Sequence, residues 1–206
     1  MANIDLKQVY REHYSAKASE PVVVDVPSRP FLMIDGAGDP NTSEQYRNAV
    51  EALYPLAYGL RAAVKRLTGD AYVVMPLEGL WWSEQTSPFD PANKSAWLWT
   101  AMICLPEMVT ASMSDDVLPA VGASKHLVAG DLARVELFSE GKSAQVLHVG
   151  SYADESPTIA KLHEYIEALG CSPAGKHHEI YLSDPRTTDP AKLRTIIRQP
   201  FTDTQP

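Results

Sequence analysis

The chain has 206 residues, of which 45% are hydrophobic and 21% are charged. This length fits one domain or two small modules that share a core, and the composition is that of a folded protein rather than a disordered one. The formal net charge of −8 argues against unaided binding to nucleic acid or to anionic membranes, because both need a positive field. An acidic cleft would instead attract lipophilic cations.

The cysteines and the N-terminal residues indicate the compartment. Cys104 and Cys171 form no CxxC pair, and two lone cysteines in a chain of this length are typical of a reducing cytosol, with a disulfide between them as the alternative. Residues 1–17 carry charges throughout and no apolar segment, so they do not resemble a secretory signal. No apolar run approaches about 20 residues, so no membrane-spanning helix is predicted. We therefore expect a cytoplasmic protein.

Apolar spacing divides the first half of the chain into helical and extended segments. Residues 5–14 predict a short helix. Ser43 is a suitable N-cap for the clearest helix of the sequence, in which apolar residues recur at three- and four-residue steps up to Gly69. Pro55 should kink or interrupt this helix. Strands are expected at residues 21–26, 31–35, 71–82 and 96–105.

The second half predicts a similar alternation. A weaker helix is expected at about 114–126, although Pro119 opposes it. Ser156 should cap a second clear helix, with Pro157 at its first position and Gly170 after its end. Further strands are expected at residues 132–138, 143–149, 177–183 and 193–198.

The order strand, glycine-containing loop, helix, strand, strand therefore occurs twice, at about 30–105 and about 143–198. Two such modules in a pseudo-twofold arrangement predict an α+β fold, with one antiparallel sheet, both long helices on one face and a ligand groove on the other. Residues 1–206 would then form one domain, in which module one (about 21–110) and module two (about 131–200) are joined by the weaker helix. A two-layer domain without a groove is the alternative.

The alternation in the strand HHEIYLS separates two sets of side chains. His178, Ile180 and Leu182 form a side that is expected to pack on the helices. Glu179 and Tyr181 project from the opposite side, which we expect to face the groove.

Four tryptophans and a second acid lie on the neighbouring strands. The tryptophans are Trp81, Trp82, Trp97 and Trp99. The same period of two places Glu78 and Trp82 outward, and a bulge at Gly79 would exchange Trp82 for Trp81. If these faces coincide with that of Glu179, the groove holds two acids, a phenol and several indoles. Flat aromatic walls around a carboxylate are typical of a ligand pocket, and a solvated sheet face is the alternative.

Three segments resemble a known family: MPLEGLWW (75–82), ALYPLAYGLR (52–61) and HHEIYLSDPRTTDPAKLRTIIRQP (177–200). They are similar to the stand-alone GyrI-like small-molecule-binding proteins, and the resemblance runs from about Tyr10 to Pro200. It implies the paired strand–helix–strand–strand fold. The same domain is the drug-sensing module of some bacterial transcription regulators, in which an acid of the penultimate strand lies at the floor of an aromatic cleft and meets lipophilic cations.

The resemblance implies that Glu179 occupies the position of that acid. Some stand-alone members are reported as hydrolases that open the strained cyclopropane of DNA-alkylating natural products, as a detoxification activity. A cyclopropane conjugated to a carbonyl needs a base that directs water at the ring carbon and a donor that steadies the enolate-like oxygen. We expect Glu179 to be the base, and Tyr181 or another cleft donor to stabilise the enolate-like oxygen by a hydrogen bond. Trp82, Trp97 and Trp99 would stack on the flat substrate.

Two further residues belong to the expected ligand site. Tyr152, in the loop before the second helix, would rim the cleft or lie on the surface. Glu78 is either a second cleft acid or a structural acceptor for backbone amides. No metal is expected, because His177 and His178 point to opposite faces of one strand. No cofactor is expected, because no phosphate-binding or dinucleotide-binding motif is complete.

Two other functions are kept as alternatives. A binding protein without chemistry would sequester an aromatic cation, with Glu179 as counter-charge and cation–π contacts worth about 0.5–2 kcal/mol each from the indoles. An interaction protein is the second alternative, with gyrase as the candidate partner, because the family's name comes from a gyrase-inhibiting relative. A DNA-binding regulator is not expected, since no helix-turn-helix segment precedes the domain and the chain is acidic. The sequence does not indicate the oligomeric state.

Overall fold

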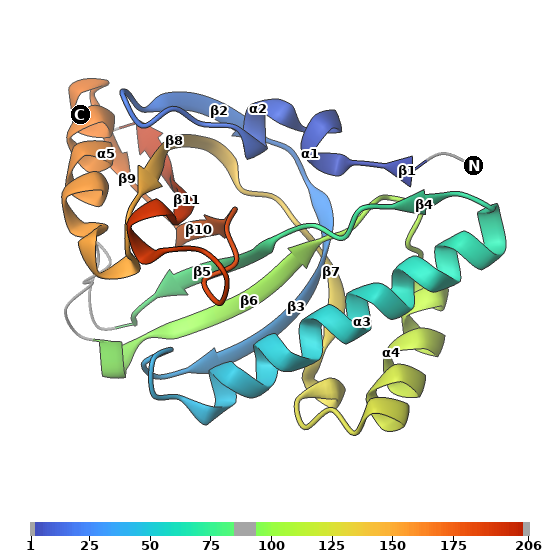
Figure 1. Ribbon diagram of the computed structural model, residues 1–206. Helices are drawn as coiled ribbons and strands as arrows, with labels where there is room; N and C mark the ends of the chain where they lie inside the picture. The colour runs from blue at the N-terminus through green and yellow to red at the C-terminus, as the bar shows by residue number, and fades with distance from the viewer. Residues whose placement is uncertain (1–2, 85–93, 204–206) are drawn as a thin grey trace.

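The computed structural model of the protein describes residues 3–84 and 94–203. Within these ranges the centre of the fold is a large antiparallel sheet, whose neighbouring strands come from distant parts of the chain (Figure 1). The strands, in their order across the sheet, are β2 (Val22–Val26), β8 (Gly141–Val149), β11 (Arg194–Asp203), β10 (His177–Tyr181), β5 (Leu77–Trp82), β6 (Leu98–Cys104), β3 (Arg29–Ala37) and β7 (Arg134–Phe138). A short strand, β9 (Cys171–Pro173), pairs with the end of β11. The α+β class with a large antiparallel sheet is therefore confirmed.

The two halves of the chain meet in the middle of the sheet, where β10 pairs with β5. On one side of this junction lie β6 and β3, and on the other lie β11 and β8. Each edge strand comes from the opposite half: β2 pairs with β8, and β7 pairs with β3. The two halves thus exchange one edge strand each, which the order of elements in the sequence does not reveal.

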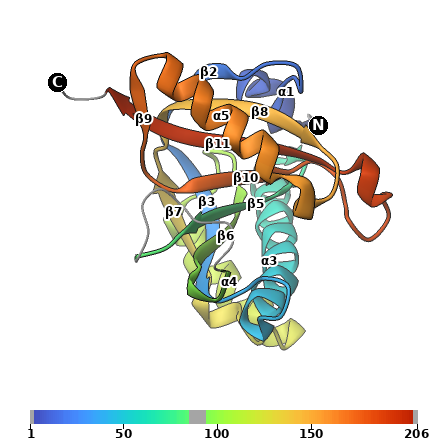
Figure 2. The same ribbon diagram turned by 90° about the vertical axis from the view of Figure 1, so that its left-hand side faces the viewer.

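Both long helices cover the same face of the sheet. These are α3 (Glu44–Thr68) and α5 (Ser156–Ala168), and Figure 2 shows α5 in front of β8 and β11. Ile159 and Leu162 of α5 pack with Val146 and Ile197, which lie opposite each other on β8 and β11. A third helix, α4 (Ala111–Lys125), packs against α3.

The N-terminal segment covers the other face of the sheet. It contains α1 (Leu6–Val9) and α2 (Arg11–Tyr14), and the Tyr14 hydroxyl donates a hydrogen bond of 2.7 Å to the buried Glu78 carboxylate of β5. The remaining short elements are β1 (Asn3–Ile4), which pairs in parallel with β4 (Ala71–Tyr72), and the 3₁₀ turns η1 (Lys94–Ala96), η2 (Gly130–Leu132), η3 (Tyr152–Asp154) and η4 (Pro190–Lys192).

The helix ends follow the sequence closely, with one shift. The Ser43 hydroxyl accepts a hydrogen bond from the Tyr46 amide at the start of α3, and Gly69 ends that helix with a φ of 79°. The helix runs through Pro55 without interruption. Of the two effects expected of this proline, an interruption is therefore excluded and a kink is still compatible with the structure. For α5, the predicted cap is wrong by one residue: Glu155 is at the N-cap, and Ser156 is already helical.

The expected strand 71–82 is two separate strands. β4 ends at Tyr72 and β5 begins at Leu77, and β4 joins β1 rather than the main sheet. Pro76 lies directly before β5 and has no N–H with which to continue a ladder, so a single long strand was the wrong prediction.

The position of Glu179 relative to the helices also differs from the expectation. Glu179 lies opposite Ile197, and Ile197 lies opposite Val146 under α5. Residues directly opposite in an antiparallel ladder share a face, so Glu179 is on the helix-bearing face and His178 is on the face covered by the N-terminal segment. The expected groove on the helix-free face is therefore not where this acid lies. Alternation separates two faces, but it does not say which one carries the helices when both are buried.

Candidate functional site

The floor of the candidate site consists of β10, β5 and β6, between α3 and α5. Glu179 lies opposite Gly79, and His177 lies opposite Trp81, which in turn lies opposite Trp99. All five residues therefore belong to one face of the sheet. The pairing brings an acid and two indoles together from strands that are about 80–100 positions apart in the sequence.

The Glu179 carboxyl is held through both of its oxygens. The side chain is buried, with the residue 8% exposed. The Tyr181 hydroxyl donates a hydrogen bond of 2.8 Å to Oε2, and Nε2 of His177 lies 3.3 Å from Oε1. Burial and then the Glu179 charge raise the pKa of Tyr181 well above its usual value, so this phenol keeps its proton. The carboxyl consequently has a fixed orientation on the floor of the site.

Two glycines allow the indole rings to lie flat on the sheet. A Cβ atom at Gly79 would come within 2.8 Å of Nε1 of Trp81, and a Cβ atom at Gly36 would collide with the Trp99 ring. Both indoles are almost fully buried, and neither indole nitrogen has a hydrogen-bond partner. Gly79 is part of the regular ladder rather than a bulge, so its function is to make room for Trp81. Trp81, and not Trp82, therefore shares the face of Glu179.

Aromatic side chains extend this surface on either side. Tyr46 of α3 contacts both Trp81 and Trp99, with ring centroids 5.6 Å and 5.0 Å apart. Trp97 contacts Trp81 at 5.3 Å, and the Lys94 ammonium lies 5.4 Å from the Trp97 ring. Burial and then the Glu179 charge raise the pKa of Tyr46, which indicates that its hydroxyl end is near the acid.

A second buried carboxyl, Glu155, lies in the same site. It occupies the N-cap position of α5 but makes no capping hydrogen bond, and the residue is only 5% exposed. Burial and then the Glu179 charge raise the pKa of Glu155 to about 9, although the neighbouring Thr195 and Lys94 act in the opposite direction. At pH 7 this carboxyl is protonated. A proton-bearing acid beside a second carboxyl is an arrangement that suits acid–base chemistry.

Tyr152 lies at the rim of the site. Its ring meets that of Tyr181 edge to face at 5.5 Å, and the residue is 40% exposed. Burial and then the charges of Glu155 and Glu179 raise its pKa to about 12. Tyr152 therefore belongs to the same cluster of acids and aromatic rings, while one edge of it faces solvent.

Comparisons with known proteins identify the family. The family model described as "GyrI-like small molecule binding domain" matches residues 19–201. The chain belongs to this GyrI-like family. No curated protein matches the chain.

Solved GyrI-like structures support the assignment. A crystal structure of an uncharacterized conserved protein from Listeria innocua is 37% identical, with a TM-score of 0.88, and the alignment covers 97% of this chain and 100% of that one. A structure named as a hydrolase from Listeria innocua is 36% identical, with a TM-score of 0.85 and the same coverage. The EcmrR C-terminal domain is 11% identical, with a TM-score of 0.55 over 90% of this chain and 98% of that one, and shows a likeness of fold alone.

Two of the residues expected in the site lie on the opposite face of this GyrI-like sheet. Glu78 lies opposite Ile180 and is fully buried, accepting hydrogen bonds from Tyr14 and from Nε2 of His178 at 3.0 Å. Of its two expected roles, that of a cleft acid is wrong, because Glu78 lies on the other face; it is a structural acceptor, but its donors are side chains rather than backbone amides. Trp82 also faces away from Glu179, and the Lys176 ammonium lies 3.5 Å from its ring centroid.

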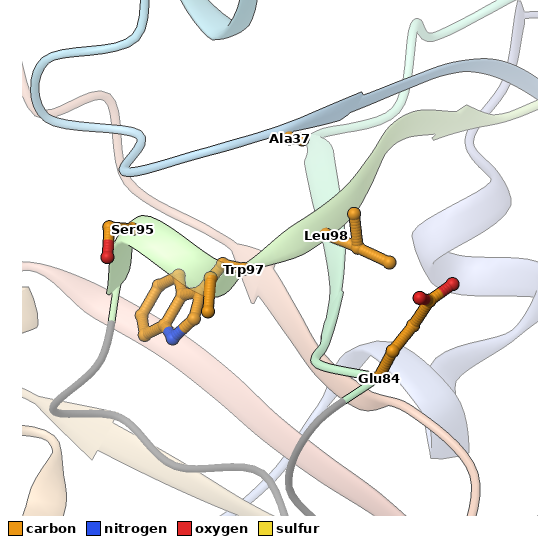
Figure 3. A pocket seen from close by; sticks show the side chains of 6 residues that line it. Ala37, Glu84, Ser95, Trp97 and Leu98 are labelled. Atoms are coloured by element: carbon orange, nitrogen blue, oxygen red, sulfur yellow. The ribbon is translucent and has the colours of Figure 1, made fainter.

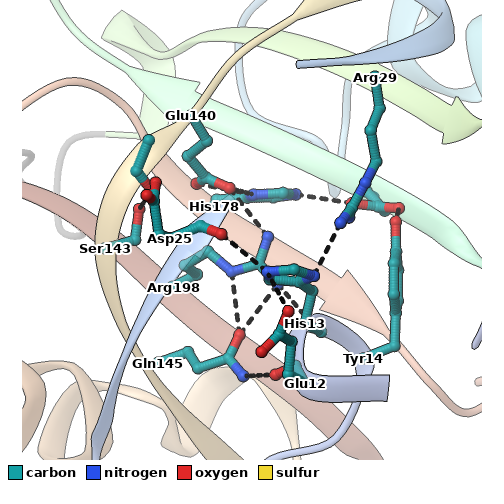
Figure 4. A network of polar contacts seen from close by, with 12 residues as sticks. Glu12, His13, Tyr14, Asp25, Arg29, Glu140, Ser143, Gln145, His178 and Arg198 are labelled. Carbon is teal, nitrogen blue, oxygen red and sulfur yellow. Dashed lines mark hydrogen bonds and ion pairs between the residues drawn. The ribbon is translucent and has the colours of Figure 1, made fainter. Parts of the chain in front are cut away.

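Glu78 is joined through His178 to a buried polar network on that opposite face, in which Figure 4 shows His178, Glu140, Arg198 and Gln145. Nδ1 of His178 lies 2.9 Å from Oε1 of Glu140, whose Oε2 accepts a hydrogen bond of 2.8 Å from Nη1 of Arg198. Arg198 also donates to Gln145, whose amide nitrogen donates to the Glu12 carbonyl of the N-terminal segment at 2.7 Å. This network binds the N-terminal segment to the back of the sheet.

A shallow hollow of about 250 Å³ lies beside Trp97 (Figure 3). Its other lining residues are Ala37, Glu84, Ser95, Ala96 and Leu98. It shares only Trp97 with the aromatic cluster described above.

Among the residues that the structure describes, no three His, Cys, Asp or Glu side chains are grouped so as to hold a metal ion, and no helix is long and apolar enough to cross a membrane.

Sequence reasoning missed two parts of the site. Glu155 is a single acid in a loop, and its approach to Glu179 depends on how α5 is placed over β11, which no local pattern reports. Tyr46 lies within the regular apolar spacing of its helix, and that spacing does not distinguish it from a core residue. The glycines under the indoles were the available signal, because a glycine opposite a strand aromatic commonly marks a close approach.

Proposed function

We propose that this GyrI-like protein hydrolyses planar small molecules that carry an electrophilic cyclopropane, and so detoxifies DNA-alkylating compounds. The observation that carries the proposal is the buried Glu179 carboxyl among aromatic rings, held through both oxygens by Tyr181 and His177. Hydrolase is also the name given to related Listeria innocua structures at 36–37% identity, which supports the reaction class but names no substrate.

In the proposed reaction, Glu179 accepts a proton from a water molecule while the water oxygen bonds to a ring carbon. The C–C bond of the cyclopropane breaks, and its electron pair moves into the conjugated carbonyl group. General-base assistance of this kind is typically worth about 10²–10⁴ in rate.

Tyr181 has a different role from the one expected. Its single hydroxyl proton is already donated to Glu179 at 2.8 Å, so it is not available to an oxygen of the substrate. We assign Tyr181 as a positioning residue that orients the base. Trp81, Trp97 and Trp99 form the proposed stacking surface, and each offset aromatic contact is worth about 0.5–1.5 kcal/mol beyond its buried area.

The test is Glu179→Gln with an aromatic dienone that bears a fused cyclopropane. The wild-type protein should convert it to the ring-opened alcohol, detected by mass spectrometry as the addition of one water. Glu179→Gln should bind the compound, quench tryptophan fluorescence similarly and lose about 10²–10⁴ in kcat. The matched control is Glu164→Gln, because Glu164 is exposed on α5 and should leave the rate unchanged. Wild-type turnover in Glu179→Gln would remove this residue from the mechanism.

A non-catalytic binding protein is the second candidate. A buried carboxyl among indole and phenol rings also suits an aromatic cation, and the matching family model is described as small-molecule-binding. The same assay separates the two functions. Fluorescence quenching by planar cations together with no ring-opened product from any cyclopropane would establish sequestration and exclude the hydrolase.

A further inference from the structure

The proposed hydrolysis leaves one chemical task without a residue. The electron pair released by the cyclopropane arrives at the carbonyl oxygen, which needs a proton or a strong hydrogen-bond donor as the ring opens. Tyr181 donates to Glu179, and His177 also faces that carboxyl. The donor must therefore come from another side chain of the same cluster.

We propose that Glu155 is the general acid of this site, and that it protonates the substrate carbonyl oxygen while Glu179 activates the water. This inference rests on the proposed function. It assigns a second catalytic carboxyl, on a different element of the fold, to the opposite end of the reacting system. The expected substrate is accordingly a neutral aromatic compound with a carbonyl acceptor conjugated to the strained ring.

The conformation of Glu155 supports this assignment. A residue at an N-cap usually turns its side-chain oxygen back to the first amides of the helix. Glu155 does not, since its side chain makes no capping hydrogen bond. Its residue is 5% exposed, and Oε1 has no hydrogen-bond partner. Leaving a buried polar atom without a partner is destabilising, so an oxygen kept in this state is suited to meeting a ligand.

The surroundings of Glu155 keep it protonated. The groups that face it from neighbouring elements are Glu179 and Tyr181 on β10, Thr195 on β11, His148 on β8, Tyr152 in η3 and Lys94 in η1. Of the two nitrogens of His148, Nδ1 bonds the Thr158 hydroxyl and Nε2 the Ser151 carbonyl. Burial and the negative charge of Glu179 dominate, and the pKa of Glu155 is raised to about 9. The acid therefore carries a proton at pH 7.

The floor of the site also holds two indole nitrogens that are buried donors. The N–H groups of Trp81 and Trp99 are buried and have no partner. Indole nitrogen is a donor only, so these groups favour an acceptor oxygen on the ligand and do not favour a cation. A neutral Glu155 and unpartnered donors together describe a site that accepts developing negative charge.

Water gives one proton to Glu179 and forms the new C–O bond, and the broken C–C bond supplies the electron pair that becomes the enol or phenol at the former carbonyl. Glu155 gives its proton to that oxygen and becomes a carboxylate. After the product leaves, Glu179 returns its proton through water to Glu155. The net change is the addition of one water, and no oxidant, reductant or cofactor is needed.

Glu155→Gln tests the proposal, with Glu164→Gln as the control on the same helix. Glutamine keeps the size of the side chain but cannot deliver a proton. We expect kcat to fall by about 10²–10⁴ with little change in KM. Wild-type kcat should decrease as the pH rises through about 9, and this alkaline decrease should be absent from Glu155→Gln.

A second readout separates an acid from a merely structural residue. A series of cyclopropyl dienones with increasingly electron-withdrawing substituents yields more stable enolates, which need less proton donation. The rate lost in Glu155→Gln should therefore be largest for the least activated substrate and small for the most activated one. A structural defect would lower all rates by the same factor. Infrared titration of the ligand-free protein should also show a carboxylic acid band that disappears near pH 9 and is missing in Glu155→Gln.

The experiments distinguish a failure of the acid role of Glu155 from a failure of the proposed hydrolase function. Wild-type kcat in Glu155→Gln, combined with an inactive Glu179→Gln, would overturn the acid role and leave the proposed function standing. An equal loss of rate across the substrate series would also overturn it. A wild-type protein that forms no product from any member of the series would overturn the proposed function, and the acid role with it.

Discussion

Removing the charge of Glu140 should destabilise the protein strongly, because this carboxylate is buried between two positively charged side chains. Its side chain is 1% exposed and contacts two cations, His178 and Arg198. Burial alone would raise the pKa of Glu140, but the charges and hydrogen bonds of His178 and Arg198 lower it to about 2. The carboxylate is therefore the counter-ion on which both buried cations depend.

The magnitude follows from that pKa. A carboxyl with a pKa of about 2 in the folded chain and 4.5 in the unfolded chain stabilises the folded state by about 3 kcal/mol at neutral pH, since each pKa unit corresponds to about 1.4 kcal/mol. Breaking a buried ion pair from one side typically costs about 3–5 kcal/mol. We expect Glu140→Gln to lower the free energy of unfolding by an amount in this range.

Urea unfolding followed by tryptophan fluorescence measures this loss. The control is Glu136→Gln, because Glu136 also pairs with an arginine, Arg134, at 2.7 Å, but both side chains are well exposed. Exposed ion pairs contribute about 0–1 kcal/mol. If Glu140→Gln cost no more than Glu136→Gln, the network would not be the electrostatic anchor described above.

The pH dependence provides a further check on the same network. Burial would lower the pKa of His178, but Glu140 and then Glu78 raise it to about 9. A cation whose pKa is raised on folding stabilises the folded state fully below the unfolded value of 6.5, and this contribution is lost as the pH rises through 9. The wild-type protein should lose stability over that alkaline window. In Glu140→Gln the loss should begin at lower pH, because only Glu78 is left to hold the proton on His178.

Two more changes test the aromatic floor. Gly36→Ala should displace the Trp99 ring, since the added Cβ would collide with it. Overpacking of this kind costs about 1–3 kcal/mol, and thermal unfolding together with a changed tryptophan emission would report it. The control is Gly122→Ala in α4, whose added Cβ would meet no atom closer than 3.7 Å, and which should leave the emission unchanged. Trp81→Phe should weaken binding of a planar ligand, while Trp82→Phe, on the other face of the sheet, should not; equal losses in a fluorescence-independent binding assay such as calorimetry would contradict the assignment of faces.

Much of the fold could be predicted because the relevant signals are local. Ser43 and Gly69 define the ends of α3, and a 25-residue amphipathic helix between such caps has few alternatives. The alternation in HHEIYLS correctly separated Glu179 and Tyr181 from His178 and Ile180. The antiparallel class followed from the short connections and the repeated order of elements.

The rest could not be predicted because it depends on contacts between distant segments. Alternation usually distinguishes a buried from a solvated face, but on β10 both faces are buried: Ile180 is fully buried on one, and Glu179 is 8% exposed on the other. Which face of β10 is covered by the N-terminal segment, and which is left for the candidate site, depends on a segment more than 160 positions away along the chain. Glu78 and Trp82 were grouped with Glu179 for this reason. Glu155 joins the site only through the position of α5 over the sheet.

The two faces of β10 have complementary functions. Glu179 and Tyr181 point to the candidate site, while His178 points to Glu140 and Glu78 behind the sheet. The back network ties β10 to β5, β8 and the N-terminal segment at once, so the backbone under Glu179 has little freedom to move. Catalytic groups held in advance avoid the cost of reorganisation during the reaction. In the proposed mechanism, the buried charges behind the sheet act indirectly, by keeping the proposed base Glu179 beside the aromatic floor.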